Sequence, residues 1–270
     1  MSLTSAMGTG VSGLLANGEA VSVIGNNLAN INTVGFKQGR TLFSDLLSSQ
    51  IDNGQIGRGS QIQAVQNIFS QGSLETTGSA TDLAIEGDAL FVLQDPNASG
   101  GQFYSRAGAF TFDKNNILTN PDGYKVLGYA ITGGVTGTTL STIDRSSPAP
   151  PAGASIAKIS VNDLGVMSAL YSDGTTADIY QIALAKFPST NGLDKAGGSI
   201  FAQTSASGVP VIDQTSFKGN KIISNSLEQS NVDMAEQLVK MITTQRAYTA
   251  NSKTITAADQ MIQDTLNIIR

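Results

Sequence analysis

The sequence contains no cysteine, no histidine and no tryptophan. Without cysteine the chain forms no disulfide and offers no thiolate nucleophile. Without histidine it has no Ser-His-Asp triad and no imidazole ligand for a metal ion. A pair of carboxylates could still catalyse hydrolysis, but nothing marks any of the 21 Asp and Glu residues as such a pair. We therefore expect that the protein is not an enzyme and has no catalytic residue, no cofactor and no metal site.

Charged residues are also scarce, at 14% of the chain, against about a quarter in an average domain. The net charge is −5 and Lys and Arg form no cluster, so we expect no nucleic-acid partner, since one would require a basic stripe. No apolar run reaches about 18 residues, so no membrane insertion is expected. The N-terminus lacks the basic and apolar parts of a cleaved secretory signal. The protein is expected to be cytosolic, or exported without a cleaved signal.

Amide, hydroxyl and apolar residues make up most of what remains. The chain has 270 residues and 40% hydrophobic content, which predicts two or three domains with real cores. A surface built on amides and hydroxyls can pack against copies of itself without charge repulsion, which favours assembly.

A heptad period runs through the first thirty residues, where the steps between apolar or small residues alternate between four and three. Its positions are Met7, Val11, Leu14, Gly18, Val21, Gly25 and Leu28. Glycines interrupt this helical pattern, and each costs up to about 1 kcal/mol relative to alanine. We therefore expect a helix that is weak alone and forms against a partner.

A stronger heptad period runs from Asn231 to Arg270, which is almost free of Gly and Pro. We expect Ser230 or Asn231 as the N-cap, with Asp233 in the first turn. The repeat comprises Met234, Leu238, Met241, Gln245, Tyr248, Ser252, Ile255, Asp259, Ile262, Leu266 and Ile269.

Three polar residues share one position of this repeat: Gln245, Ser252 and Asp259. Buried polar residues of this kind fix the register of a coiled coil. The other hypothesis is that they face a wet surface, such as a lumen or a neighbouring subunit. The sequence leaves both open.

The middle of the chain changes to a period of two, which is typical of strands. Residues 81–95, 104–131 and 157–187 each contain short apolar runs separated by turn sequences such as DKNN, NPDG, NDLG and SDGT. Strands at hairpin spacing predict an antiparallel β domain. Residues 132–155 are rich in Gly, Thr, Ser and Pro, which predicts a flexible loop.

These patterns together predict an α+β fold. Long N- and C-terminal helices would pair as a coiled-coil inner domain, with an antiparallel all-β domain inserted between them. The expected boundaries are 1–35 and 228–270 for the helical inner core, 36–80 for an extended connecting segment, 81–131 and 156–227 for the β domain, and 132–155 for the loop. The residues expected to pack the helical core are Leu14, Val21, Leu28, Leu238, Met241, Ile255, Ile262 and Leu266.

The stretch NNLANINTVGFK, residues 26–37, places an amide cluster where the first helix should end. Asparagine tolerates the left-handed conformation that ends helices, Gly35 can adopt a positive φ, and Phe36 can anchor the chain as it leaves. One hypothesis is simply a capped helix end, and the other is a set of amides that bond to neighbours in an assembly. We predict this helix-to-β joint and subunit interface at Asn26, Asn27, Asn30, Asn32, Gly35 and Phe36.

Four stretches of this sequence resemble the signatures of one family, the bacterial flagellar axial proteins of the rod and hook. They are GVSGLLANGEAVSVIGNNLANINTVGFK, FSQGSLETTGSATDLAIEGDALFVL, FYSRAGAFTFDKNNILTNPDGYKVLGY and SNVDMAEQLVKMITTQRAYTANSKTITAADQMI. The opening MSLTSAMGTGVSG and the FSQGSLETTG segment are more similar to hook proteins than to rod proteins. Typical hook proteins are longer and carry an outer domain where this chain has 132–155, so the resemblance implies a short form that lacks most of that domain.

The resemblance implies a structural subunit of the flagellar hook, a bendable hollow tube that transmits torque from rod to filament and encloses the export channel. The implied partners are copies of the chain itself in a helical homopolymer, the distal rod protein, the hook cap, the hook–filament junction proteins and the flagellar type III export apparatus. The implied location is extracellular, in the hook and basal body, and the β domain would form the outer wall. A straight distal rod subunit is the alternative, and a coiled-coil adhesin is a remote one.

Overall fold

The chain folds into two compact units, each assembled from separate stretches of sequence. The computed structural model describes residues 3–46, 50–51, 54–55, 57–96, 101–132, 134–146, 155–212 and 219–268. The first unit, here called the helical unit, comprises Met1–Ile31, Gln38–Ile68 and Val232–Arg270. The second, here called the sheet unit, comprises Asn32–Lys37 and Phe69–Asn231.

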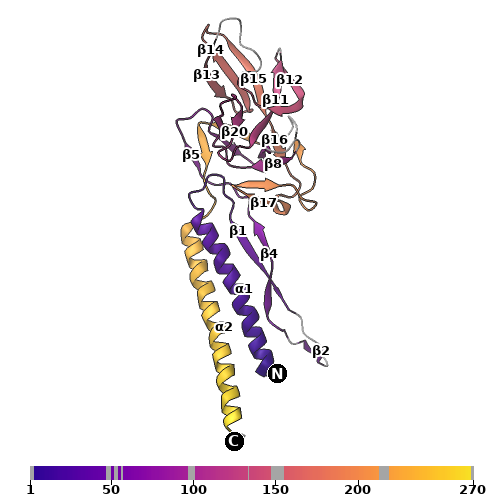
Figure 1. Ribbon diagram of the computed structural model, residues 1–270, viewed down its shortest axis with the longest axis vertical. Helices are drawn as coiled ribbons and strands as arrows, with labels where there is room; N and C mark the ends of the chain where they lie inside the picture. The colour runs from indigo at the N-terminus through magenta and orange to yellow at the C-terminus, as the bar shows by residue number, and fades with distance from the viewer. Residues whose placement is uncertain are drawn as a thin grey trace. The chain divides into compact units, whose positions relative to one another are not determined.

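The helical unit contains two α-helices and a β ribbon. Helix α1 (Leu3–Ala29) and helix α2 (Met234–Ile268) lie side by side and run in opposite directions (Figure 1). Strands β1 (Gly39–Asp45) and β4 (Ser60–Asn67) pair antiparallel, with a register shift between Leu42 and Phe43. The short strands β2 (Gln50–Ile51) and β3 (Gly54–Gln55) also pair with one another.

Helix α2 begins later than the sequence suggests. The Asp233 carboxylate accepts a hydrogen bond from the backbone N–H of Glu236 at 3.1 Å, which is the bond that an N-cap residue makes. Asp233 therefore caps the helix, in place of Ser230 or Asn231. A carboxylate at this position also interacts favourably with the positive end of the helix dipole.

Glycines set how closely α1 and α2 approach. A Cβ atom added at Gly10 would lie 2.9 Å from the Ile255 side chain, and one added at Gly13 would lie 2.5 Å from the Asn251 side chain. A Cβ atom at Gly10 would therefore displace the Ile255 side chain, and one at Gly13 would displace the Asn251 amide. The glycines that weaken α1 as an isolated helix thus allow its close contact with α2.

The side of α2 that is turned inward is offset from the predicted heptad stripe. In one predicted row Met241, Ile255 and Ile262 are half-buried, whereas Met234 and Tyr248 are exposed. The other predicted row is exposed, with Leu238 at 42% and Leu266 at 61%. The positions one residue earlier are less exposed instead: Gln237, Thr244, Asn251 and Ala258. The inward side of α2 thus combines one apolar row with a row of polar and small residues.

The predicted fold class is therefore wrong. The described chain is mostly β, with two α-helices and one large curled sheet. The helices do not form a coiled coil, which requires both rows of the heptad to pack as knobs into holes. Strands are also not confined to an inserted domain, because β1 and β4 belong to the same unit as the helices. The heptad period is present in the sequence, but α1 approaches α2 closely at its glycines. Of the residues of α2 that face α1 there, Ile255 belongs to the predicted heptad and Asn251 does not.

The sheet unit contains strands β5 to β21 and a short 3-10 helix at Thr190–Gly192. The strands are β5 (Leu74–Thr76), β6 (Leu83–Glu86), β7 (Leu90–Gln94), β8 (Gln102–Ser105), β9 (Thr111–Phe112), β10 (Leu118–Thr119), β11 (Lys125–Thr132), β12 (Val135–Thr142), β13 (Ile156–Val161), β14 (Val166–Tyr171), β15 (Thr176–Ile182), β16 (Leu184–Lys186), β17 (Asp194–Gly197), β18 (Ile200–Ala202), β19 (Val211–Ile212), β20 (Lys221–Ser224) and β21 (Ser226–Glu228).

Thirteen of the described strands form one antiparallel sheet, whose main path runs β13-β14-β15-β11-β7-β8-β18-β17. Strand β20 pairs with β6 and β21 pairs with β5 as separate ribbons. Several connections use the turn sequences that the sequence predicts. The Asp113 carboxylate, for example, accepts hydrogen bonds from the backbone N–H groups of Asn115 and Ile117, both at 2.8 Å, as an Asx turn does.

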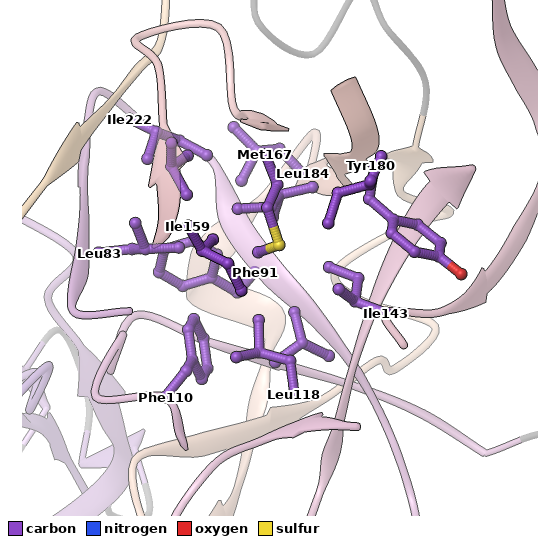
Figure 2. Close-up of a cluster of buried hydrophobic side chains, with 14 of the residues drawn as sticks. Leu83, Phe91, Phe110, Leu118, Ile143, Ile159, Met167, Tyr180, Leu184 and Ile222 are labelled. Atoms are coloured by element: carbon purple, nitrogen blue, oxygen red, sulfur yellow. The ribbon is translucent and has the colours of Figure 1, made fainter. Parts of the chain in front are cut away.

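The core of the sheet unit is a dense cluster of aliphatic and aromatic side chains (Figure 2). Phe91 and Phe110 meet edge to face, with ring centroids 5.0 Å apart. Leu83, Leu118 and Ile143 surround them and are fully buried. Such burial contributes about 1.5–3 kcal/mol per large apolar side chain, so this unit has the larger core of the two.

Two segments differ from their expected description. The connecting segment predicted at 36–80 contains strands β1 and β4, because these two stretches pair with one another as an antiparallel ribbon. The loop predicted at 132–155 contains strand β12, which pairs with β11. Residues 147–154 of that loop, and residues 269–270 at the end of the predicted helical domain, lie outside the described residues.

Candidate functional site

Asn27, one of the four clustered asparagines, is buried at the point where three elements of the helical unit meet. Its side-chain Nδ2 donates to the Gly39 carbonyl at 2.8 Å and to Oε1 of Gln237 at 3.2 Å, and its Oδ1 accepts from the Gly39 N–H at 2.9 Å. Gln237 in turn donates from Nε2 to Oε1 of Gln38 at 3.0 Å. This amide network joins the last turn of α1, the start of β1 and the first turn of α2.

The other asparagines of the cluster behave differently. Asn30 donates from Nδ2 to the backbone carbonyl and to Oδ1 of Asn26, at 2.9 and 3.0 Å. The Asn30 backbone N–H also contacts the carbonyls of Asn26 and Asn27, both at 3.2 Å. These bonds are local ones that end a helix, while Asn26 and Asn32 are exposed. A role of these exposed amides in contacts between subunits stays a prediction.

We expect Asn27→Ala to lower the free energy of unfolding of the full chain by about 1–3 kcal/mol, because Gln237 and Gly39 would lose buried hydrogen-bond partners. Denaturant unfolding followed by far-UV circular dichroism measures this change. The matched control is Asn26→Ala, which removes an exposed amide one residue away and should cost less than about 1 kcal/mol. Equal effects of the two substitutions would contradict the assigned role of the buried network.

A second polar cluster lies within the sheet unit, around Glu228 at the end of β21. The Lys37 Nζ lies 2.6 Å from Oε1 of Glu228, and the Arg106 Nη1 lies 3.2 Å from Oε2. The Gly72 N–H donates to Oε1 at 2.9 Å. Lys37 also donates to the Ser70 carbonyl at 2.7 Å. Glu228 thus connects segments that are far apart in the sequence.

The three charged side chains of this cluster are essentially buried, with exposures of 0% for Lys37 and Glu228 and 2% for Arg106. Burial lowers the pKa of Lys37, and the nearby Glu228 carboxylate partly opposes that shift. Burial likewise lowers the pKa of Arg106, again against the effect of Glu228. Since a buried charge is costly without its partner, the cluster is stable only as a complete set.

This cluster holds the segment Asn32–Lys37, which belongs to the sheet unit although it follows α1 directly. Gly35 has a φ of +66° and donates from its N–H to the Glu228 carbonyl at 2.7 Å. A Cβ atom at Gly35 would collide with the backbone of Ala107. Phe36 is buried, and the Lys195 ammonium lies 4.6 Å from its ring centroid, which is a cation–π distance.

Gly35 and Phe36 were predicted from the sequence, whereas Lys37, Arg106 and Glu228 were not. One available signal was the scarcity of charge in this chain. A lysine directly after an anchoring phenylalanine, in a protein with few lysines, was a candidate for a specific ion pair. Its partner is 191 residues away in the sequence, so only the tertiary structure could identify it.

The predicted helix-packing residues lie in different environments. Those that are half-buried are Leu14, Val21, Leu28, Met241, Ile255 and Ile262. Leu238 and Leu266 are exposed, as is the predicted polar face of Gln245, Ser252 and Asp259. A register device and a wet or intersubunit surface both stay hypotheses for these three residues. What they contact in an assembly stays a prediction.

Large apolar side chains are exposed along both helices. On α1 they are Val11 and Leu15. On α2 they include Leu238, Val239, Ile242, Met261, Leu266 and Ile268. Exposed apolar side chains in this number on one pair of helices are typical of a protein–protein contact surface.

Neither a cluster of potential metal ligands nor a membrane-spanning helix is found in the part of the chain that the structure describes. No group of three or more His, Cys, Asp or Glu side chains is placed to hold a metal ion within that part of the chain. No helix in the same residues is both long and apolar enough to cross a membrane.

Three family descriptions match separate parts of the chain. Residues 7–37 match "Flagella basal body rod protein", residues 84–169 match "Flagellar hook protein FlgE/F/G D1 domain", and residues 223–268 match "Flagellar basal body rod FlgEFG protein C-terminal". The first match contains the amide cluster of α1, and the last contains Glu228 and α2.

Individual proteins are similar over nearly the whole chain. The flagellar basal-body rod protein FlgG of Bacillus subtilis (strain 168) is 34% identical over 277 positions, covering 97% of this chain and 98% of that protein. FlgG of Caulobacter vibrioides is 35% identical over 276 positions, covering 96% and 97%. The flagellar hook protein FlgE of Brucella suis biovar 1 is 27% identical over 399 positions, covering 100% of both chains.

Proposed function

The chain belongs to the family of flagellar basal-body rod and hook proteins, and from this premise we propose that it is a structural subunit of the distal flagellar rod. In this role it polymerises into a straight hollow shaft that transmits torque. The observation that carries the proposal is the match in length to rod proteins. The FlgG relatives align with this chain over 267 to 281 positions, close to its own 270 residues.

The hook function expected from the sequence has weaker support. The similar hook protein aligns over 399 positions, far more than the 270 residues of this chain, and at lower identity than the rod proteins. The opening residues that favoured a hook protein cover only a small part of the sequence. A distal rod subunit therefore replaces the hook subunit as our preferred function, and a bendable hook is the second candidate.

The proposed partners follow from this position. Copies of the chain contact one another in a helical homopolymer, and hook subunits join its outer end. The subunit is delivered by the flagellar type III export apparatus and acts in the basal body. The proposal includes no catalytic step. The exposed apolar side chains of α1 and α2 support the homopolymer, because subunit contacts can cover them.

Electron microscopy of the polymer formed by the purified full-length chain at high concentration tests this function. A distal rod subunit should form straight, stiff tubes with a central channel. Curved tubes that adopt several shapes would favour the hook. If the chain formed only small closed oligomers, the proposal of an axial subunit would fail.

We expect Leu238→Asp to abolish or strongly reduce polymer formation while leaving the sheet unit folded. Leu238 is exposed on α2, so the aspartate would place a charge in an apolar subunit contact without disrupting a core. Sedimentation of the polymer measures assembly, and near-UV circular dichroism reports the fold. The control is Val209→Asp, at an apolar side chain that is 76% exposed in the sheet unit. Normal polymerisation of Leu238→Asp would exclude this part of α2 from the interface.

A further inference from the structure

Helix α2 separates its charges along its length. The basic residues Lys240, Arg246 and Lys253 occupy its first twenty residues. From residue 254 to residue 268 the charged residues are Asp259 and Asp264. Lys240 pairs with Glu236 at 2.7 Å, whereas no ion pair within the described residues involves Arg246, Lys253 or Asp264. The described part of the helix therefore carries a basic segment followed by an acidic one.

The acidic end is unfavourable for an isolated helix. The C-terminal end of a helix dipole favours basic residues, yet the last described turn of α2 contains none. Ile268 and Leu266 are 84% and 61% exposed there, and Met261 is exposed one turn earlier. In Figure 1, α2 extends past the start of α1, so its last turns have no helix beside them. Among the described residues, this end combines exposed apolar side chains with two aspartates and no basic residue.

A shallow groove elsewhere on the same helical unit has the complementary character. It is lined by Gly18 and Val21 of α1 and by Gln245, Tyr248 and Thr249 of α2. Gly18 leaves room in the groove, because a Cβ atom there would touch only Tyr248, at 4.0 Å.

Positive charge lies beside this groove. Lys253 lies one helical turn after the lining residue Thr249 and therefore on the same face of α2. Arg246 is exposed and follows the lining residue Gln245 in the sequence. Helix α1 contributes one acidic residue, Glu19, which lines a different recess together with Leu15 and Ile62. The groove is therefore apolar at its floor, and Lys253 places positive charge on the same face of α2.

We propose that the acidic end of α2 in one copy, residues 259–268, docks in this groove of the next copy. Met261, Leu266 and Ile268 would cover its apolar floor, and Asp264 would lie near Arg246 and Lys253. The end of α2 and the groove are different surfaces, so the contact is heterologous and repeats from copy to copy. Such a contact produces an open polymer when its rotation does not close a ring. The inference rests on the proposed function, and it specifies which surfaces of two copies meet.

Charge reversal tests the contact through the critical concentration for polymerisation. Asp264→Lys should raise it roughly three- to tenfold, because attraction becomes repulsion at a partly covered site. The double variant Arg246→Glu/Lys253→Glu should raise it by a similar factor. A lysine also suits this end of the helix dipole better than an aspartate, so a loss of assembly would not arise from a weakened helix end. Asp163→Lys, an exposed reversal in the sheet unit, controls for the change in net charge.

Mixing the two variants gives the decisive result. In an alternating copolymer, the lysine introduced into the first variant meets the two glutamates introduced into the second. At the next contact, the unchanged Asp264 of the second variant meets the unchanged Arg246 and Lys253 of the first. The equimolar mixture should therefore polymerise near the wild-type critical concentration, whereas each variant alone does not. This rescue should weaken as salt is raised, because exposed charges are screened.

The outcomes separate this inference from the proposed function. If wild-type protein polymerises and the charge variants behave like Asp163→Lys, the proposed contact is wrong and the axial function stands. If the single and double variants fail and their mixture also fails, the groove and the acidic end do not meet one another, and the contact is again wrong. If wild-type protein does not polymerise at all, the proposed function itself fails.

Discussion

Replacing Glu228 by alanine is expected to lower the free energy of unfolding of the chain by about 3–5 kcal/mol, because it leaves two buried cations without their counter-charge. Lys37 and Arg106 both pair with this carboxylate, and all three side chains are almost fully shielded from water. The Gly72 N–H would lose its acceptor as well. Denaturant unfolding of the full-length protein, followed by tyrosine fluorescence and circular dichroism, measures the loss.

A matched control lies on the neighbouring strand. Glu75 of β5 is opposite Leu227 of β21, next to Glu228, but it is exposed. Its side chain accepts one hydrogen bond, from Gln229 at 2.6 Å, and Glu75→Ala should cost less than about 1 kcal/mol. A similar small effect of Glu228→Ala would contradict the conclusion that this cluster holds Asn32–Lys37 in the sheet unit.

Gly35→Ala is expected to be the second most damaging change, with a loss of about 2–5 kcal/mol. A left-handed conformation costs a non-glycine residue about 1–2 kcal/mol, and forcing a methyl group into a packed site costs about 1–3 kcal/mol more. At Gly35 both apply, because φ is +66° and the added Cβ would meet the Ala107 backbone. The substitution should also expose Phe36, so limited proteolysis should cut the chain near residues 32–37 faster than in the wild type.

A comparison with Gly123→Ala separates the conformational cost from the packing cost in that loss of stability. Its φ is +86°, but a Cβ atom there would have nothing within 4 Å. Gly123→Ala should therefore show only the conformational cost of about 1–2 kcal/mol. If Gly35→Ala and Gly123→Ala had the same effect, the close packing of the Gly35 segment against Ala107 would contribute nothing to stability.

Several local features, which depend on neighbouring residues, were predictable from the sequence, although the N-cap of α2 and strands β1, β4 and β12 were not. The period of two and turn sequences such as DKNN predicted antiparallel strands with the Asx turn that Asp113 makes. Gly35 was predicted to adopt a positive φ, and it does so. The family could also be identified from short stretches at both ends of the chain, and the comparisons confirm it.

The coiled-coil prediction failed because a heptad period says only that a stripe of the helix is apolar. Which stripe is covered depends on the partner. The α1 glycines Gly10 and Gly13 admit Ile255 and Asn251, and Asn27 binds Gln237. These contacts turn Gln237 inward and leave Leu238 exposed, a shift of one residue that no property of α2 alone could reveal.

Local chemistry thus determined, from the sequence by itself, the strands and turns of 81–131 and 157–187, the position of Gly35 after the first helix, and that the chain has no disulfide and no His-dependent triad. Only the tertiary structure decided which helix faces meet, that Asn32–Lys37 belongs to the sheet unit, and that Lys37, Arg106 and Glu228 form one buried cluster. The physical reason is separation along the chain. A turn is selected by residues within four positions, whereas Lys37 and Glu228 are 191 residues apart and come together only when the core around them has formed.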